Sequence, residues 1–267
     1  MPQLQTSVRL ALGISYNGQA YQGWQSQASG QTVQDKVEAA LSKLASGKVS
    51  TLCAGRTDAG VHALMQVVHF DTEAQRLPVS WVRGTNAFLP RDIGVQWAVR
   101  VPMGFHCRAS ALSRRYTYVV VESAVRPSLH AGRVGWVLRP LTLEPMLQAC
   151  HHLVGEHDFT SFRAAACQAL SPVKHMLRID ISRRGAYWRF EFEANAFLHH
   201  MIRNIMGYLV SIGQGKKPPG WIHDVLAARS RKVAAPTFSP DGLYFLGPRY
   251  EPAWGLPDQA LAYDGLP

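Results

Sequence analysis

The chain has 267 residues, of which 47% are hydrophobic and 17% are charged, so it has enough apolar material for a core and is not a disordered chain. Its 28 lysine and arginine residues exceed its 18 acidic residues and give a formal net charge of +10. This excess favours a polyanionic partner such as nucleic acid. A soluble protein that is simply basic is the alternative.

The cysteines and the apolar segments limit where the chain works. The four cysteines stand far apart and include no C-x-x-C pair, which gives no support to a zinc ribbon or a thioredoxin-type site; they are Cys53, Cys107, Cys150 and Cys167. We expect them to be small buried residues in a reducing compartment. The first ten residues show no basic region followed by an apolar run, and no stretch of about 18 apolar residues could cross a bilayer. The expected location is therefore the cytoplasm, with no membrane partner.

The N-terminal part predicts a strand, a glycine-rich loop and a helix. Apolar residues alternate from Val8 to Ile14, which is typical of a half-buried strand, and residues 17–31 form the loop. Thr32 and Asp35 have the spacing of a capping box, and Gly47 suits the end of the helix that follows.

The next two predicted strands frame a loop. They lie at Val49–Cys53 and Met65–Asp71, so Gly55–Ala63 becomes an exposed connection, a common place for chemistry.

The remaining elements mix helices and strands without a regular βαβ alternation. We expect helices at Val79–Phe88, Leu143–Leu153, from Leu198 and at Trp221–Ala228, and strands at Ile93–Val99, Arg115–Val121, Lys174–Ile181 and Tyr187–Ala194, the last two joined by a turn at Gly185. The fold class is therefore α+β with an antiparallel sheet. A boundary near Pro102–Ser113 divides the chain into an N-terminal subdomain, residues 1–105, and a C-terminal one, residues 106–267. No direct sequence repeat relates them, and only their similar order of strands and helices hints at duplication.

Several familiar motifs are missing. The chain has no G-x-S-x-G elbow and no G-x-x-x-x-G-K-[ST] phosphate loop. The run Gly213–Lys217 resembles the end of a phosphate loop, but it follows a predicted helix instead of a strand. The adjacent pairs His151-His152 and His199-His200 would point about 100° apart on a helix and would not converge on one metal, so we predict no metal site.

The segment Gly55–Gly60 has the properties of a catalytic loop. Arg56 and Asp58 stand two residues apart between two glycines, so little side-chain bulk surrounds the acid. A catalytic aspartate needs such access to approach a substrate atom. The alternative is a turn in which Asp58 bonds its own backbone and Arg56 is solvated.

Motifs along almost the whole chain resemble those of the TruA family of tRNA pseudouridine synthases. They are Tyr16-Asn17-Gly18 with Tyr21–Gln25, the segment Gly55–Ala63, Asn86 with Leu89–Ile93, Phe105–Ala109 with Arg115–Tyr118, Gly155–Phe159 with Ser161-Phe162, Phe197-Leu198 with Met201–Ile205 and Gly207, and Gly242–Tyr244. The family often has a more compact run of alanine and prolines where this chain has Ala234–Ser239.

The resemblance implies a fold, a reaction and three catalytic residues. The fold is the pseudouridine synthase fold, with two similar subdomains joined through a mainly antiparallel sheet. Asp58 is the nucleophile, and attack at the pyrimidine C6 or action at the ribose C1′ both stay open. Arg203 is the basic partner that keeps the carboxylate ionised and oriented. Tyr116 stacks on the uracil and assists proton transfer, whereas Tyr118 better fits a tyrosine that faces the core.

The same resemblance implies how substrate is bound. Arg56 fills the gap left by the flipped nucleotide, and Leu243 walls the base pocket, for which plain core packing is the alternative. The partner is tRNA, modified at positions 38 to 40 of the anticodon stem-loop by a homodimer that needs no cofactor. Candidates for contact with the RNA backbone are Arg108, Arg114, Arg115, Lys216 and Lys217; each is equally well explained as a solvated surface charge.

Two other functions fit parts of the sequence. A non-catalytic RNA-binding module shares the charge and the aromatic residues but does not require Asp58, Tyr116 and Arg203 together. A metal-dependent phosphoesterase needs clustered acids or histidines, and the 18 acids of this chain are scattered.

Overall fold

The computed structural model describes residues 7–165, 167–230 and 235–257, and it divides the chain into two compact units. The described parts of unit 1 are residues 7–112 and 244–257, and unit 2 extends from residue 113 to residue 243. Part of the N-terminal stretch searched for a secretory signal (residues 1–6) and Ala234 of the alanine-proline run lie outside the described residues. None of the described helices has the length and apolar character needed to span a membrane.

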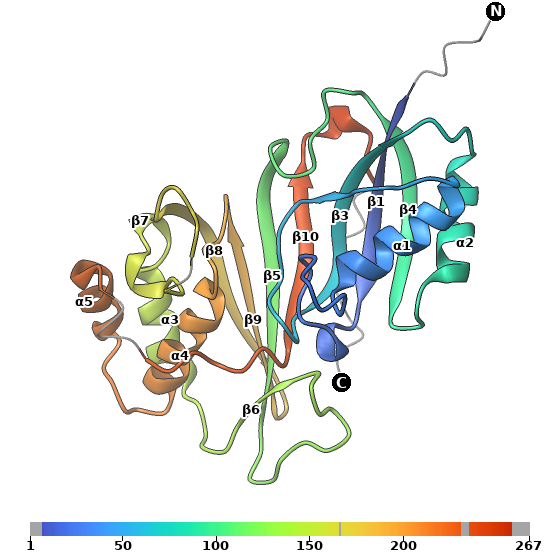
Figure 1. Cartoon of the computed structure of the whole chain (residues 1–267). Helices are drawn as coiled ribbons and strands as arrows, with labels where there is room; N and C mark the ends of the chain where they lie inside the picture. The colour runs from blue at the N-terminus through green and yellow to red at the C-terminus, as the bar shows by residue number, and fades with distance from the viewer. Residues whose placement is uncertain (1–6, 166, 231–234, 258–267) are drawn as a thin grey trace, which may run out of the picture. The chain divides into compact units, whose positions relative to one another are not determined.

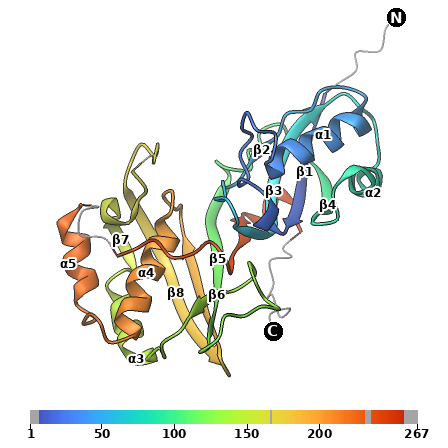
Figure 2. The same cartoon turned by 60° about the horizontal axis from the view of Figure 1, so that its bottom comes forward.

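Unit 1 combines a mainly antiparallel sheet with two helices. Its strands are β1 (Val8–Tyr16), β2 (Leu52–Cys53), β3 (His62–Thr72), β4 (Ile93–Val101) and β10 (Leu243–Tyr250), and its helices are α1 (Val33–Ala45) and α2 (Pro78–Phe88). Strand β10 belongs to this unit from Tyr244 onward. The strand order is β4-β1-β3-β10, with β2 paired to β3, and only the β10–β3 pair among these is parallel. In both views α1 and α2 lie side by side on one face of the sheet (Figures 1 and 2).

Helix α1 forms as predicted, from local sequence alone. Thr32 accepts a hydrogen bond from the Asp35 amide, and the Asp35 carboxylate accepts one from the Thr32 amide, so the capping box is complete. The helix ends one residue earlier than the predicted glycine stop, because Ser46 adopts the left-handed conformation with φ of 56°.

Strand β1 is confirmed, but it is buried on both faces instead of one. Leu10, Leu12 and Ile14 are fully buried, and so is Ala11 on the opposite face. That second face packs in a core cluster with Trp97 and Phe105, among others. Gly13 makes room for the Trp97 ring, since a Cβ at Gly13 would stand only 2.3 Å from it.

Unit 2 combines mainly antiparallel strands with three described α-helices. Its strands are β5 (Ala111–Glu122, from Ser113 on), β6 (Gly135–Val137), β7 (Gly155–Asp158), β8 (Val173–Arg184) and β9 (Tyr187–Ala194), and its helices are α3 (Leu143–His151), α4 (Met201–Gly213) and α5 (Trp221–Ala228). The order is β5-β9-β8-β7, with β6 parallel to β5. Helix α3 contacts β8 and packs against α4 and α5 (Figure 2). The α+β class with a mainly antiparallel sheet is confirmed.

The chain first changes unit at the C-terminal end of the predicted boundary region, Pro102–Ser113. The chain changes unit at residues 112 and 113, inside β5, and returns to unit 1 at Tyr244, inside β10. Strand β10 explains the return, because Tyr244 and Phe245 pair with His62 and Ala63 of β3. Strand β10 was not predicted from the sequence.

Candidate active site

The loop between β2 and β3 carries Asp58 in a tight turn. Gly60 has a φ of +80°, and the Val61 amide donates to the Asp58 carbonyl at 3.1 Å. Arg56 is exposed and Asp58 is half-buried, whereas Thr57 between them is buried. The predicted loop between two strands is therefore present, although β3 begins at His62, inside the predicted range.

The N-terminal glycine-rich segment holds this loop by direct backbone contact. The Trp24 amide donates to the Thr57 carbonyl at 3.1 Å, and the Gly60 amide donates to the Tyr21 carbonyl at 3.4 Å. The contact is so close that a Cβ at Gly23 would lie 2.6 Å from the Thr57 carbonyl oxygen. Two motifs that are far apart in the sequence therefore form one structure around Asp58.

Two buried polar side chains complete the support of the loop. The hydroxyl of Tyr16 shares a hydrogen bond of 2.7 Å with the hydroxyl of Thr57. The Gln66 side chain accepts a hydrogen bond from the Gly55 amide and donates one to the Gly55 carbonyl. Neither role was predicted from the sequence. The available signal was Gln66 itself, a polar residue in the middle of an apolar strand.

In unit 2, Tyr116 contacts an aromatic ring and Arg203 donates to a backbone carbonyl. Tyr116 lies on β5 and contacts the ring of Phe197 edge to face at 5.2 Å. Arg203 lies in the first turn of α4, where its Nε donates to the Phe238 carbonyl at 3.0 Å, and the Phe238 amide donates to the Arg203 carbonyl at 3.0 Å. Tyr118 is fully buried against Phe238, as expected of a core-facing tyrosine.

The start of α4 differs from the predicted helix. The helix begins at Met201 and not at Leu198, because His200 at its N-cap adopts a left-handed conformation with φ of 62°. The rings of His199 and His200 consequently lie 4.2 Å apart. The prediction that these adjacent histidines point apart on a helix is wrong.

The other predicted binding residues have varied surroundings. Leu243, the last described residue of unit 2, is buried, and its amide donates to the Pro240 carbonyl at 3.0 Å. Arg108 is exposed. Arg114 and Arg115 are half-buried, and Arg114 donates to the Asn195 carbonyl at 2.9 Å.

The sequence-predicted site residues fall into two groups. Unit 1 brings together Arg56 and Asp58 on one loop. Unit 2 holds Tyr116, Arg203 and Leu243. The exposed lysines Lys216 and Lys217 also belong to unit 2, where the Lys217 ammonium lies over the ring of Trp221 at 5.1 Å.

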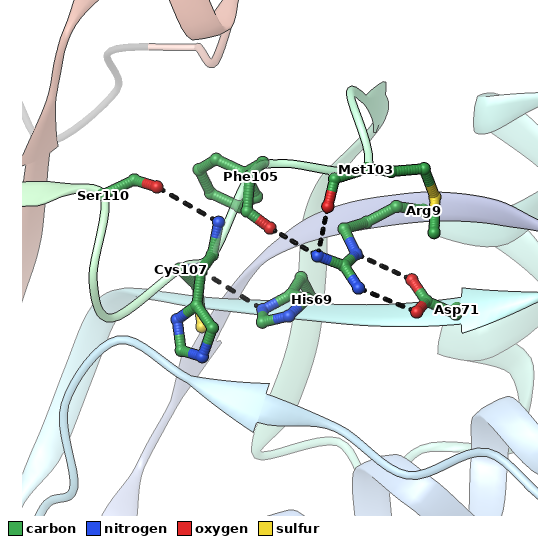
Figure 3. A network of polar contacts seen from close by, with 8 residues as sticks. Arg9, His69, Asp71, Met103, Phe105, Cys107 and Ser110 are labelled. Atoms are coloured by element: carbon green, nitrogen blue, oxygen red, sulfur yellow. Dashed lines mark hydrogen bonds and ion pairs between the residues drawn. The ribbon is translucent and has the colours of Figure 1, made fainter.

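A cluster of His69, His106 and Cys107 in unit 1 has ligand-type atoms within 4.8 Å of one another, but its hydrogen bonds do not suit a metal (Figure 3). Nδ1 of His69 accepts the Cys107 amide at 3.3 Å, and Nδ1 of His106 accepts two further backbone amides. In the neutral rings the proton is then on Nε2, so neither nitrogen offers a lone pair. Burial and the nearby charge of Arg9 lower the pKa of His69 to about 4, so its ring is neutral at pH 7.

This cluster is instead part of the structure that fixes the segment after β4. The Arg9 guanidinium forms an ion pair with Asp71 at 2.7 Å and donates to the carbonyls of Met103 and Phe105 at 2.6 and 2.8 Å (Figure 3). These contacts hold Phe105 in the core of unit 1.

A basic α+β protein with a half-buried aspartate on a glycine-flanked loop suits the class of proteins that act on a polyanionic substrate. Comparison with known proteins specifies the class further. A model of the tRNA pseudouridine synthase family matches residues 13–108 and 149–251. The chain belongs to this family.

Whole-length relatives agree. The chain is 73% identical over 260 residues to a tRNA pseudouridine synthase A of Albidiferax ferrireducens, with 97% of this chain and 100% of the relative covered. It is 70% identical to the protein of the same name from a Polaromonas species and 64% identical to that of Paracidovorax citrulli, with the same coverage. The family resemblance found in the motifs is confirmed, and with it the class of an isomerase that converts uridine to pseudouridine in tRNA.

Proposed function

We propose that this chain isomerises uridine to pseudouridine at positions 38, 39 and 40 of the tRNA anticodon stem-loop, with Asp58 as the nucleophile. In the reaction the N1–C1′ bond breaks, the base rotates, and C5 bonds to C1′. The C5 proton is lost and N1 gains a proton, so atoms and electrons balance without an outside reagent.

The observation that carries the proposal is the setting of Asp58. Its carboxylate is half-buried on a loop whose flanking residues are fixed by hydrogen bonds, and its neighbours Arg56 and Ala59 are exposed. Such a group combines access with a defined position, which is what an attack on a bound substrate requires. Arg56 is then available to fill the space of a flipped nucleotide.

The proposed partners of Asp58 are Arg203 and Tyr116, with Leu243 as an apolar wall of the base pocket. The first turn of α4 contains no acidic residue and holds Arg203. A cation there opposes the helix dipole at a cost of about 0.3–1 kcal/mol, so helix stability does not explain Arg203. Its Nε bond to the Phe238 carbonyl orients the guanidinium, and an anionic partner would offset the cost. Tyr116 is held by Phe197 with its ring in a fixed orientation, which suits stacking on a base.

The direct test uses tRNA labelled with tritium at C5 of uridine. Wild-type protein should release tritium without any added cofactor, and Asp58→Asn should release none while it binds tRNA with an unchanged Kd. Asp224→Asn is the matched control, since Asp224 is an exposed aspartate of α5. Full activity of Asp58→Asn would contradict the proposal, and an inactive wild type that binds tRNA would favour an RNA-binding module.

The positions, the assembly and the location need separate measurements. Transcripts that retain uridine at only position 38, 39 or 40 should each be modified at that position. Sedimentation should give twice the mass of one chain if the enzyme is a homodimer, and fractionation should place it in the cytoplasm. A chelator should leave activity unchanged, whereas a phosphoesterase would lose it.

A further inference from the structure

The catalytic loop is anchored on both sides of Arg56 by a buried polar frame that consists of Gln66, Tyr16 and Thr57. Gln66 of β3 bonds both the amide and the carbonyl of Gly55. Tyr16 of β1 bonds the hydroxyl of Thr57, directly before Asp58. The exposed fractions of Gln66, Tyr16 and Thr57 are 0%, 5% and 7%, so water contributes little to these contacts.

The chemistry of Gln66 is specific to a carboxamide. Its Oε1 accepts the Gly55 amide, and its Nε2 donates to the Gly55 carbonyl. A glutamate could only accept hydrogen bonds and would bury a charge, and an apolar residue would form neither bond. Gln66 therefore fixes Gly55 on one side of Arg56, and Tyr16 fixes Thr57 on the other side.

Tyr16 reaches the loop from the end of β1. The pairing of β1 with β3 shifts register between Ile14 and Tyr16, because their partners Gln66 and Ala63 are three residues apart on β3. The additional residue is on β3, at the end that adjoins the Asp58 loop, so Tyr16 keeps the alternation of β1. Its hydroxyl reaches Thr57, 41 residues further along the chain.

A stability role alone does not account for this frame. Its neighbours in β1 and β3, such as Leu12, Val67 and Val68, are apolar and fully or almost fully buried. Apolar residues at positions 16 and 66 would fill the same core without the cost of removing polar groups from water. A fully satisfied buried polar network instead specifies one arrangement, and here that arrangement is the position of the loop.

We propose that Gln66 and Tyr16 are positioning residues that fix the Asp58 loop for catalysis, an inference that rests on the proposed role of Asp58. The substitutions Gln66→Met and Tyr16→Phe keep the shape of each side chain and remove the hydrogen bonds. A misplacement of about 1 Å can reduce a rate by about 100-fold, so we expect kcat to fall roughly 10- to 100-fold in each variant. The Kd for tRNA should change by less than about threefold, because neither buried side chain is placed to contact RNA.

The matched control is Asn86→Leu. The Asn86 carboxamide bonds the amide and the carbonyl of Val95 at 2.7 and 2.9 Å, which is the same arrangement that Gln66 makes with Gly55. Loss of a carboxamide clamp should lower the urea midpoint in both variants, but only Gln66→Met should lower kcat in the folded enzyme. If both variants lose kcat only in proportion to their unfolded fraction, the role is structural and the inference is overturned.

Coupling between the two residues is the sharper readout. Because both residues fix the same short loop from either side of Arg56, Gln66→Met combined with Tyr16→Phe should be about as slow as the slower single variant. Fully additive losses of kcat in the double variant would overturn the shared frame, and so would a wild-type kcat in Tyr16→Phe. If Gln66→Met does not fold, Tyr16→Phe alone provides the test. An active Asp58→Asn would instead contradict the proposed function, so the two failures are distinguishable.

Discussion

Gly23→Ala should slow catalysis by pushing directly on the backbone of the proposed catalytic loop. The added methyl group would stand 2.6 Å from the Thr57 carbonyl oxygen and 3.1 Å from the Asp58 carbonyl carbon. Ordinary contact begins near 3.4 Å, so the loop must move by 3.4 − 2.6 = 0.8 Å to accept it. A shift of this size predicts a fall in kcat on the order of 10- to 100-fold.

The backbone conformation adds a second effect that must be separated from the first. Gly23 has a φ of +88°, and an alanine there costs about 1–2 kcal/mol of folding free energy. Gly30 belongs to the same glycine-rich segment, has a φ of +63° and has no atom within 4 Å of the added Cβ. Gly30→Ala therefore carries the conformational strain without the push on the loop.

The assay compares the two variants in single-turnover pseudouridine formation and in urea denaturation. Both variants should lose about 1–2 kcal/mol of stability, and only Gly23→Ala should lose the additional 10- to 100-fold in rate. Equal rates for Gly23→Ala and Gly30→Ala would refute the reasoning, because they would show that the contact between the two segments does not set the position of Asp58.

Three further predictions concern stability. Because the pKa of buried His69 is lowered to about 4, the unfolded chain binds a proton first as the pH falls below the ordinary histidine pKa. The free energy of unfolding should therefore drop by up to ~3 kcal/mol between about pH 6.5 and 4. Urea titrations should show a smaller drop in His69→Asn. Burial would raise the pKa of Glu122, but hydrogen bonds from Leu141 and Trp188 and the charge of Arg183 outweigh it, so the pKa is lowered. The free energy of unfolding should therefore fall as the pH drops below the ordinary glutamate range, and it should fall less in Glu122→Gln. Gly207→Ala should cost more than ~1 kcal/mol despite better helix propensity, because its Cβ would meet the Pro236 carbonyl at 2.1 Å; Gly220→Ala, with open space, is the control for the urea midpoint.

Elements governed by local rules were predictable from the sequence. The capping box fixes the start of α1, and the turn at Gly185, with φ of +60°, joins two strands in the predicted order. These features depend on residues a few positions apart. The candidate catalytic loop was predictable for a similar reason, since its glycines and charges are contiguous.

Features that depend on distant pairing were not predictable in the same way. Strand β10 contains Gly247 and Pro248, which disfavour a strand, and it forms where Tyr244 pairs with His62, 182 residues earlier (244 − 62). The left-handed His200 shortens α4, and no local signal separates it from the neighbouring His199. The supporting roles of Tyr16 and Gln66 likewise become visible only once β1 is paired with β3.

The glycines around Asp58 serve fixation as well as access. A carboxylate that attacks a bulky nucleoside needs space around it, and glycine provides that space at the cost of a more flexible backbone. Here the glycine-rich segment at Gly18–Trp24 removes that flexibility, because the absence of Cβ atoms lets its backbone approach Thr57 and Val61 closely enough to form hydrogen bonds and direct contacts. A Cβ at Gly18 would stand 1.9 Å from the Val61 carbonyl oxygen, so the contact exists only with glycine at this position. The two segments therefore constrain one another, and a change that enlarges either one must act on Asp58 through the other.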